Sequence, residues 1–427
     1  MTMADFIKGV DIVKTISGYT GLKKIGKKYW GLCPFHDEKT ASFSVDAEKQ
    51  YYYCFGCRSG GNAVSFIMNK EGDGLEEAIT LLSQRAGVPA PVLTNGIADE
   101  DVSYKNRLYA ANREAAKYYH ELLYKPEGRN ALEYLRKRGL TDDVIRQYGL
   151  GAAPEQWSEL SNYLLKKGFT LSELEAAGLT ITRPPKSSGG RTRYFDMFRN
   201  RAMFPIIDRE KHVLAFGGRS LDGQEPKYLN TADTPVYNKR QHVYAENLLQ
   251  GQKPDRIVLV EGYMDVVSLT QFGIKGVCAS LGTALTNEQA RIIRSYAPEV
   301  YLGYDGDAAG QHAILRGLEI MEEEGIPARV LDFPDGLDPD EFIRRDGAHG
   351  FNSLPALTAP AYRLRLLRNK YDFTKAQQKK KYVEKAAEIL NALDPVGKEI
   401  YIRNLSKETG YSPEAIRRTI EGGKTNE

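Results

Sequence analysis

Residues 257–265 of the chain read IVLVEGYMD, and residues 301–310 read YLGYDGDAAG. Each stretch is a short apolar run, typical of a buried strand, that ends in an acid and a glycine-containing turn before a helical pattern. Two further apolar runs, at 276–279 and 328–331, are also flanked by helical patterns. This alternation of strand and helix predicts an α/β region with a parallel sheet covered by helices.

Acidic residues follow three of these predicted strands, in the two quoted stretches and in a third, DGLDPDE, at 335–341. The acids concerned are Glu261, Asp265, Asp305, Asp307, Asp338 and Asp340. Because the carboxyl ends of parallel strands line one edge of a sheet, we expect these side chains to meet there. Oxygen ligands favour Mg²⁺ or Mn²⁺, and paired cations of this kind support phosphoryl or nucleotidyl transfer. The alternative is ordinary loop acids and helix N-caps, which suits one such motif better than three in succession.

A second cluster of ligand-type residues lies near the N-terminus, where Cys33 and His36 are followed by Cys54 and Cys57. Two residues between ligands let one turn aim both side chains at a single ion, and the spacer between the pairs is long enough for a β-hairpin. The pattern predicts one structural zinc, against the alternative of three buried cysteines and an unrelated histidine. Lysines and aromatic residues surround the ligands, and such a mixture suits single-stranded nucleic acid.

The charge of the 427-residue chain is unevenly distributed, although the net charge is only +3. Residues 183–240 contain twelve basic and six acidic residues, whereas residues 255–341 contain six basic and sixteen acidic ones. We interpret this as a phosphate-binding surface beside metal-binding carboxylates, the alternative being two solvated faces of opposite sign. No apolar run is long enough to span a bilayer and no secretory signal is evident, so we expect a cytoplasmic protein without membrane contact.

The order of these motifs resembles the bacterial DNA primase family of the DnaG type. The Cys/His pattern comes first and the acidic motifs last, and the latter are similar to the Toprim fold. Between them, 198–206 (FRNRAMFPI), 216–219 (FGGR) and 225–230 (EPKYLN) resemble the basic subdomain of that family. The resemblance covers the chain from its first residues to about position 365.

This resemblance implies a nucleotidyltransferase that makes short RNA primers de novo on a single-stranded DNA template, from ribonucleoside triphosphates, by a two-metal mechanism. Glu261, Asp305 and Asp307 would hold Mg²⁺ or Mn²⁺, with Asp265, Asp338 and Asp340 in support. Residues of the basic face would contact nucleotides and template: Arg138, Arg199, Arg201, Arg219, Lys227, Tyr228, Asn230 and Lys239.

The implied organisation is a multidomain α/β protein. We expect a zinc-ribbon domain at 1–88, a linker at 89–103, a mixed α+β basic subdomain at 104–250, a Toprim subdomain at 251–341 and a helical segment at 342–427. The last segment matches only the beginning of the family's helicase-binding domain. We therefore expect a shortened, phage-like or mobile-element member, working as a monomer, with a partial dock for the replicative helicase.

Two other functions are compatible with parts of this pattern. A Toprim nuclease would cleave DNA with Mg²⁺ and ignore nucleotides, and a zinc-dependent single-strand-binding protein would do neither. Incubation with single-stranded DNA, ribonucleotides and Mg²⁺ or Mn²⁺ separates them, because the products are short RNA, cleaved DNA or nothing.

Overall fold

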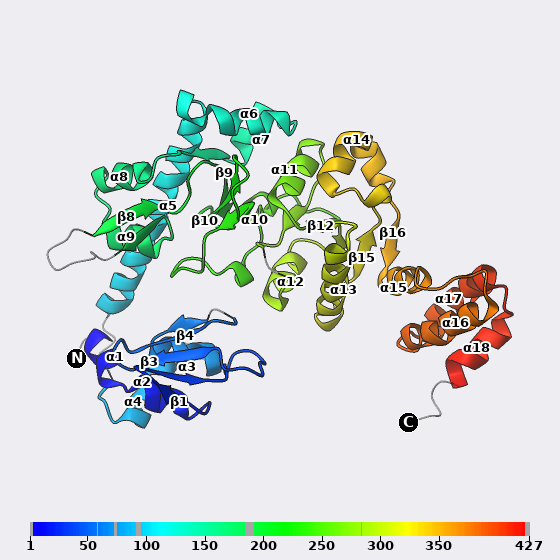
Figure 1. The fold of residues 1–427 in the computed structure, drawn as a ribbon, viewed down its shortest axis with the longest axis horizontal. Coiled ribbons are helices and arrows are strands. Elements are labelled where there is room, and N and C mark those ends of the chain that lie inside the picture. Colours follow the sequence, from blue (N-terminus) through cyan, green and yellow to red (C-terminus); the bar gives the residue numbers. More distant parts are fainter. Residues whose placement is uncertain are drawn as a thin grey trace. The chain divides into compact units, whose positions relative to one another are not determined.

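The computed structural model describes residues 3–57, 59–71, 75–90, 95–183, 192–282 and 284–422. The chain divides between Tyr104 and Lys105 into two compact units, and each is described by itself (Figure 1). Among the described helices, none combines the length and apolar character that a membrane span requires.

The first unit is a five-stranded antiparallel sheet in the order β1-β2-β3-β4-β5, with four helices. Its elements are α1 (Met3–Gly9), α2 (Ile12–Ser17), β1 (Lys23–Ile25), β2 (Lys28–Gly31), β3 (Phe43–Asp46), β4 (Tyr51–Cys54), β5 (Gly60–Gly61), α3 (Ala63–Glu71) and α4 (Leu75–Ala86). The hairpin β3–β4 lies in the spacer between the Cys/His pairs, as the sequence predicts. The zinc-ribbon prediction is confirmed.

An aromatic core holds this sheet against α3. Phe43 and Tyr52 stack with ring centroids 5.3 Å apart, and Phe66 meets Tyr52 edge-on at 5.4 Å. All three side chains are fully buried. Such pairs add to the stability that burial of their area provides, so the loops that carry the cysteines project from a rigid base.

The second unit begins within the long helix α5 (Asn95–Leu123), which starts inside the segment 89–103 that the sequence predicts as a linker. The basic subdomain continues with η1 (Pro126–Gly128), α6 (Arg129–Lys137), α7 (Asp142–Gln147), β6 (Gly151–Ala153), α8 (Glu159–Lys166), α9 (Leu171–Ala176), β7 (Thr180–Arg183), β8 (Arg193–Asp196), β9 (Arg201–Ile207), β10 (Val213–Ser220), β11 (Tyr228–Asn230), η2 (Lys239–Gln241) and α10 (Glu246–Leu249). Strands β11, β10, β9 and β6 form an antiparallel sheet in that order, and β7 pairs with β8.

The Toprim region is the predicted parallel sheet, with one difference. Its elements are β12 (Arg256–Val260), α11 (Tyr263–Gln271), β13 (Val277–Ala279), α12 (Asn287–Arg294), β14 (Glu299–Leu302), α13 (Ala308–Glu323), β15 (Ala328–Leu331), η3 (Pro334–Gly336), α14 (Pro339–Asn352) and β16 (Ala356–Thr358). The strand order is β13-β12-β14-β15-β16, and the short β16, which the sequence pattern did not reveal, is antiparallel to β15. A three-residue edge strand carries too little periodicity to be recognised from sequence.

Helices cover both faces of this sheet, as Figure 1 shows, with α11 and α14 on one side and α12 and α13 on the other. Val258 and Val260 of β12 share a core with α11 and α14. Ile257 and Leu259 share the other core, with α12 and α13. Because both faces of β12 are buried, its sequence is apolar throughout, as parallel strands usually are.

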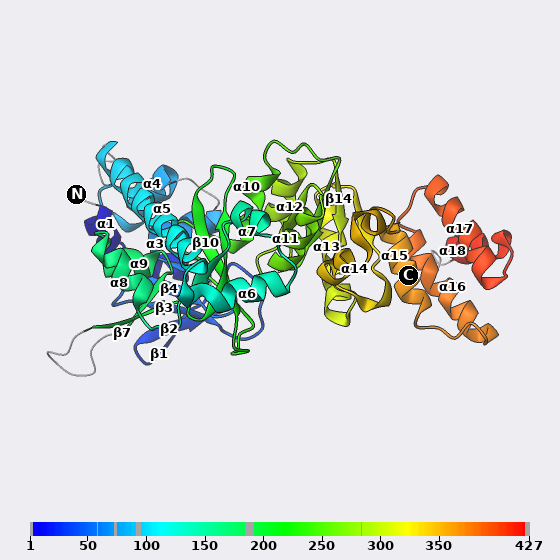
Figure 2. The same ribbon diagram turned by 90° about the horizontal axis from the view of Figure 1, so that it is seen from above.

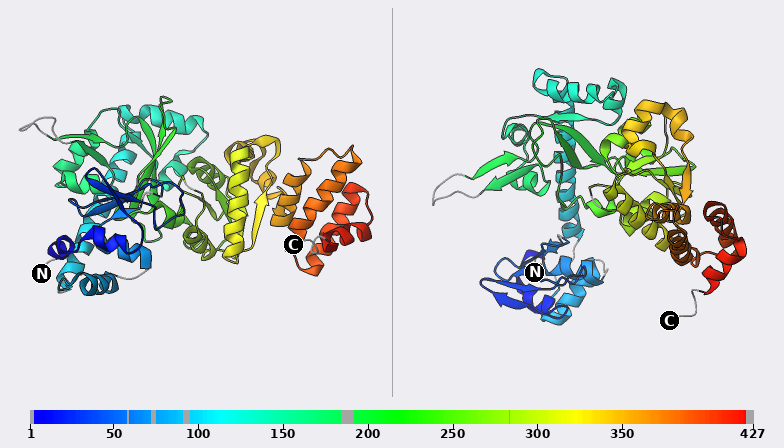
Figure 3. Two further views of the ribbon diagram at one scale, coloured as in Figure 1. Left: turned by 60° about the horizontal axis from the view of Figure 1, so that its bottom comes forward. Right: turned by 45° about the vertical axis from the view of Figure 1, so that its right-hand side comes forward.

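The tail consists of α15 (Ala359–Arg368), α16 (Ala376–Leu390), α17 (Pro395–Thr409) and α18 (Pro413–Gly422). The last three helices form a small packet beside α15 (Figures 2 and 3), with its own core that includes Leu364, Tyr382 and Leu405. Tyr401 shares a 2.5 Å hydrogen bond with Thr358 at the end of β16. The packet is therefore attached to the edge of the Toprim sheet.

Candidate metal centres

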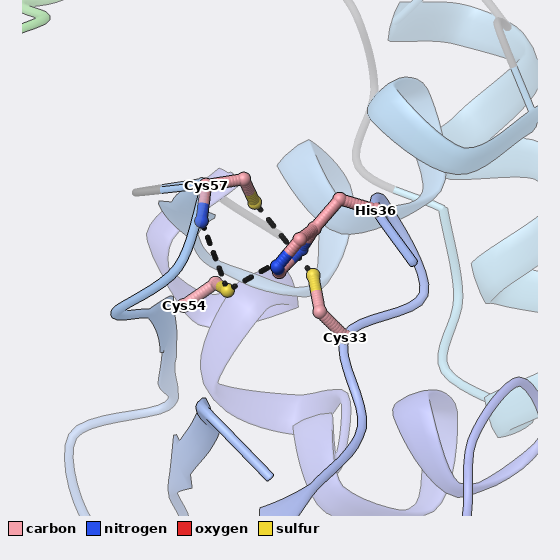
Figure 4. A group of neighbouring side chains, drawn as sticks. All are labelled: Cys33, His36, Cys54 and Cys57. Atoms are coloured by element: carbon pink, nitrogen blue, oxygen red, sulfur yellow. Dashed lines mark hydrogen bonds between the residues drawn. The ribbon is translucent and has the colours of Figure 1, made fainter. Parts of the chain in front are cut away.

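The four predicted zinc ligands converge in the first unit (Figure 4). Cys33 and His36 lie in the loop after β2, whereas Cys54 ends β4 and Cys57 lies in the next turn. All four ligand atoms lie within 4.8 Å of one another. The Sγ atoms of Cys33 and Cys57 are 3.7 Å apart, and the Sγ atom of Cys54 is 3.8 Å from Nδ1 of His36.

Backbone and side-chain groups hold this quartet in place. The amide of Phe35 donates to the Cys33 sulfur and that of Cys57 to the Cys54 sulfur, both at 3.4 Å. Glu38 lies 3.3 Å from Nε2 of His36 and accepts a 2.7 Å hydrogen bond from the Cys33 amide. It thereby fixes the ring with Nδ1 toward the sulfurs, as carboxylates behind metal-bound histidines do. Sequence reasoning missed Glu38, although its position two residues after His36 was a signal.

Glycine is required at position 56, where a Cβ atom would lie 2.5 Å from Nε2 of His36. Burial raises the pKa of the Cys33 thiol, so its thiolate form needs a cation beside it. Three sulfurs and one imidazole nitrogen, arranged around one point, are a donor set that suits tetrahedral Zn²⁺. With four protein ligands the site is closed, as a structural zinc site is.

The predicted acids gather at the carboxyl edge of the Toprim sheet. Glu261 directly follows β12, and Asp305 follows the neighbouring β14, which pairs in parallel with β12. Asp307 caps α13 by accepting a 2.7 Å hydrogen bond from the Gly310 amide, and Asp338 caps α14 through the Glu341 amide at 2.6 Å. A Cβ atom at Gly310 would lie 2.1 Å from the Asp305 carbonyl oxygen, so this close approach requires glycine.

Burial and neighbouring negative charges raise the pKa values of Glu261 and Asp305 at this edge. Burial, then Asp305 and then Asp307, raise the pKa of Glu261 to about 7. Its buried Oε1 atom has no hydrogen-bond partner in the described part of the chain. Burial and the charges of Asp338 and Asp307 likewise raise the pKa of Asp305, and Glu341 adds to this. Glu341 thus faces the site, although the sequence analysis assigned it no role.

Asp265 and Asp340 are buried and already engaged. Asp265 accepts a 3.0 Å hydrogen bond from the Gly262 amide, and burial followed by the charge of Asp338 raises its pKa well above the ordinary value. Asp340 binds Arg138 through one oxygen, which also accepts a 2.9 Å hydrogen bond from Arg344. Its other oxygen accepts hydrogen bonds from Ser268 and from Nε of Arg344, at 2.5 Å and 3.1 Å.

The sequence did not predict the network around Asp340. Both of its oxygens are occupied by an ion-pair network in which Arg138, at the end of α6, joins the basic subdomain to α14. The expected roles of Asp340 at the metal site and of Arg138 on the nucleotide stay predictions, and in this structure the two side chains pair with each other. Arg344, four residues after Asp340 on the same helix, could have been suspected from that spacing.

The basic residues of the second unit fall into an outward and an inward set. Lys227 is exposed, and its charge lowers the pKa of Asp305, so it lies near the acids. Arg219 lies over the rings of Tyr228 and Tyr134, at 5.1 Å and 5.9 Å from their centroids. Arg199 lies 4.4 Å from the ring centroid of Trp157, whose side chain is 64% exposed.

The inward set is held by the fold itself. Arg201 is 7% exposed and donates 2.9 Å hydrogen bonds to the carbonyl oxygens of Gly218 and Pro226. Asn230 accepts a 2.8 Å hydrogen bond from the hydroxyl of Tyr263. Lys239 begins η2 and is held only through its backbone, whose amide donates to Asp233 and whose carbonyl oxygen accepts from Gln289, while its side chain is partly exposed. These contacts hold the side chains of Arg201 and Asn230 within the second unit, and their contacts with nucleotide or template stay a prediction.

Comparisons with known proteins match the same four regions. Residues 1–96 match the family described as CHC2 zinc finger, and residues 118–250 match the N-terminal domain of the DNA primase catalytic core. Residues 258–343 match a family described as Toprim-like, and residues 360–414 match the DnaB-helicase binding domain of primase. A DNA primase of Clostridium acetobutylicum is 39% identical over 95% of this chain and 67% of its own length. A DNA primase of Halalkalibacterium halodurans is 36% identical over 97% of this chain and 70% of its own length.

The chain belongs to the DnaG-type DNA primase family. Its activity is that of this family, the DNA-directed synthesis of RNA primers by nucleotidyl transfer. Among solved structures, the zinc-binding and RNA polymerase domains of the Aquifex aeolicus primase cover 97% of this chain and 99% of their own length, with 29% identity and a TM-score of 0.57. The match to a DnaG primase catalytic domain bound to single-stranded DNA covers 74% of this chain and 99% of that domain, with 30% identity and a TM-score of 0.60. Both the zinc ribbon and the Toprim fold are confirmed within this family.

Proposed function

We propose that Glu261, Asp305 and Asp307 hold the divalent cations with which this primase extends RNA on single-stranded DNA. The observation that carries the proposal is the buried, unpartnered Oε1 of Glu261, in a carboxyl group whose pKa is raised to about 7 by burial and by its acidic neighbours. Acids that repel one another in this way need a cation for the ionised form to be stable.

The donor set supports Mg²⁺ or Mn²⁺ over zinc. The side chains that gather at this edge in the described part of the chain and could bind a metal are carboxylates. Hard cations prefer such oxygen ligands. No three of the described acids here bring ligand atoms within 4.8 Å of one another, so room remains for waters and substrate phosphates. Mg²⁺ in particular keeps several waters and binds through one or two carboxylates together with phosphates.

Bound divalent cations would lower the pKa of the attacking 3′-hydroxyl and neutralise the leaving pyrophosphate. The protein's own part is to position these groups. Glu261 and Asp305 are fixed by the ends of β12 and β14, while Asp307 and Asp338 are fixed as helix caps. Asp338 and Asp265 support the site from the side of α14 and α11, because the charge of Asp338 acts on both Asp305 and Asp265.

Cationic residues near the acids would bind the nucleotide. Lys227, exposed and close enough to lower the pKa of Asp305, is placed to contact the triphosphate of an incoming ribonucleotide. Arg219 presents its guanidinium beside Tyr228, and a guanidinium can make bidentate contacts with phosphate. Arg199 and the exposed ring of Trp157 form a cation and stacking pair that suits the single-stranded template. We propose that Lys239 also contacts the nucleotide or the template, because the family resemblance places it on the basic face and its side chain is partly exposed.

The zinc ribbon would also contact the template. Trp30 and Phe55 stack at 5.8 Å with their planes 14° apart, and Phe55 is 60% exposed. Tyr51, on the same strand as Cys54, is 46% exposed. Exposed rings beside the lysines of β1 and β2 form a surface on which single-stranded bases can stack.

We propose that the tail binds the replicative helicase, since residues 360–414 are similar to the helicase-binding domain of primases. Its apolar positions are divided between an inner core and the surface: Ile402 and Leu405 are buried, whereas Val396 and Ile400 on α17 are 73% and 57% exposed. We further propose that the protein itself is a monomer, which light scattering on the purified chain would test.

The proposed catalytic role is tested by primer synthesis with Glu261→Gln. The chain is incubated with single-stranded DNA, ribonucleoside triphosphates and Mg²⁺ or Mn²⁺, and labelled RNA is separated by length. We expect short RNA from the unmodified protein and from Glu288→Gln, which removes an exposed carboxyl charge on α12, and none from Glu261→Gln. Cleaved DNA in place of RNA, or equal synthesis by both variants, would contradict the assignment.

A further inference from the structure

A pocket of about 290 Å³ lies between α5 and the turn that joins β9 to β10. Six of the residues that line it are Asn106, Tyr109, Arg113, Lys211, His212 and Val213. The hairpin is anchored to the helix at this point, because the side-chain amide of Asn112 donates a 2.8 Å hydrogen bond to the Leu214 carbonyl oxygen. The volume of the pocket is close to the lower limit for small-molecule sites.

This pocket is separate from the catalytic edge. Strand β9 runs from Arg201 to Ile207 and β10 returns from Val213 to Ser220, with Arg219 paired to Ala202. At about 3.3 Å per residue, the turn lies roughly 20 Å from the strand ends that carry Arg201 and Arg219. Neither Asn106 nor Arg113 belongs to a motif that resembles the primase family.

Donor groups without partners line the pocket. The side chains of Asn106, Arg113 and Lys211 make no hydrogen bond or ion pair within the described ranges of the chain. Lys211 also has a positive φ of 69°, a backbone conformation that is uncommon for residues other than glycine. An observed backbone outlier of this kind is a reason to look for a function at the turn.

The acids nearest to these donors are already engaged. Asp208 accepts a 2.7 Å hydrogen bond from the His212 amide and lies 3.1 Å from Nδ1 of the same residue. Glu210 is paired with Arg209 at 2.8 Å. The lining itself contains no acid, although carboxylate oxygens of Asp208 and Glu210 lie within 4.8 Å of the His212 ring. These two acids are paired, whereas the cations of the lining are not, so an anionic ligand is favoured at the cations.

One wall of the pocket is aromatic. Tyr109 and His212 stack with ring centroids 4.4 Å apart and planes 18° apart. His212 is exposed, and Tyr109 packs partly against the core beneath it. A planar surface beside two cations and an amide donor is a combination that recognises a base linked to a phosphate.

We propose that this pocket binds a nucleoside phosphate, with Arg113 and Lys211 on the phosphate and the Tyr109–His212 pair beside the base. The ligand is a free nucleotide or one nucleotide of a single strand that continues past the catalytic subdomain. The two sources share this chemistry and are distinguished by experiment.

The test uses the full-length chain, with divalent cations omitted so that binding at the acidic edge is weak. Binding of AMP, inorganic phosphate and a twelve-residue oligo(dT) strand is measured for Arg113→Ala/Lys211→Ala. The matched control is Arg129→Ala/Arg146→Ala, which removes two exposed cations from α6 and α7, outside the lining of the pocket. Thermal melting confirms that both double variants are folded.

If free nucleotides occupy the pocket, AMP binding weakens about fivefold or more in the pocket variant and stays unchanged in the control. His212→Ala should then remove the preference for AMP over inorganic phosphate, because the stacking of a base on an aromatic ring is by itself worth about fivefold or more in affinity. If a strand occupies it, oligo(dT) binding weakens instead, and the salt slope falls by about 1.4, since each phosphate contact on a single strand contributes about 0.7. Equal binding of both probes by the pocket variant and the control would overturn the proposal.

Discussion

The zinc quartet and the acidic edge are two sets of metal-ligand side chains that the fold prepares in opposite ways. In the quartet the four ligand atoms lie within 4.8 Å of one another, and amides, Glu38 and the space left by Gly56 fix them. At the edge the acids are held apart on separate strands and helix caps, and one oxygen of Glu261 has no partner. A closed set suits a permanent ion, whereas an open and self-repelling set suits ions that arrive with substrate.

The largest effect is expected from removing one of the four zinc ligands. Cys57→Ser removes one of four ligands, and structural zinc contributes on the order of 10 kcal/mol to the folding of such modules. We expect zinc content to fall from one ion per chain to none and the first unit to lose its cooperative melting transition, while the transition of the second unit remains. Cys278→Ala is the control, because that cysteine is buried in β13 and should leave the zinc in place. Zinc is counted by elemental analysis, and full retention in Cys57→Ser would remove this residue from the ligand set.

A substitution at the acidic edge should abolish activity but leave the fold and the zinc intact. Asp305→Ala should lower the rate of primer synthesis by about a thousandfold or more, since several kcal/mol of charge stabilisation in the transition state are lost. Zinc content and melting should change little, because this acid destabilises its neighbours in the metal-free fold. Binding of single-stranded DNA should be kept or slightly tightened, as one negative charge is removed. Synthesis within tenfold of the unmodified protein would show that Asp305 is not a metal ligand.

A third prediction separates paired from unpaired acids at the same edge. Asp340→Asn removes the charge of a fully buried carboxylate that pairs with Arg138 and Arg344, whose side chains are 31% and 37% exposed. Because water screens the two arginines, we expect a loss below the about 3–5 kcal/mol that is typical of a wholly buried pair. Asp338→Asn, two residues earlier, keeps an equally good helix cap and removes a repelling charge, so its stability should be unchanged or raised. Denaturant unfolding of both variants measures the difference. If Asp338→Asn is the less stable variant, Asp338 and not Asp340 is the acid whose charge stabilises the fold.

The sequence predicted what depends on local spacing and missed what depends on distant partners. The zinc ligands and the acids after β12 and β14 were recognisable, because two-residue spacings and strand ends can be read along the chain. The ion pair of Asp340 with Arg138 was not, because the two residues are 202 positions apart in the sequence. Arg201 lies in a motif that looks basic and exposed, yet pairing of β9 with β10 buries it against two carbonyl oxygens. The early start of α5 was hidden because its first residues are poor in large apolar side chains.

The fourth prediction concerns pH in the metal-free protein. The pKa of Glu261 rises from an ordinary value near 4.5 to about 7 in the fold, so its protonated form is the one that folding favours. The stability it contributes is fully present below pH 4.5 and is lost as the pH rises through about 7. Mg²⁺ binds the ionised form, and we therefore expect the rise in melting temperature on adding Mg²⁺ to be larger at pH 8 than at pH 6. Glu261→Gln should remove this difference, while zinc content stays constant across the same range. A Mg²⁺ effect that does not depend on pH would contradict the open, repelling character of the edge.

The smallest effect is expected where a single cation moderates the acids. Lys227 is exposed and lowers the pKa of Asp305, so Lys227→Ala leaves the acids slightly more repelled and removes one phosphate contact. We expect the apparent KM for ribonucleotides to rise a few-fold and the salt slope of template binding to fall by about 0.7 if the lost contact is to a single strand. Lys275→Ala is the matched control, because that exposed lysine precedes β13 and lies at the amino edge of the sheet, away from the acids. A shift in KM alone places Lys227 on the nucleotide, whereas a change in slope alone places it on the template. Identical kinetics and salt dependence in both variants would show that the acidic edge is balanced by bound cations and substrate without help from this lysine.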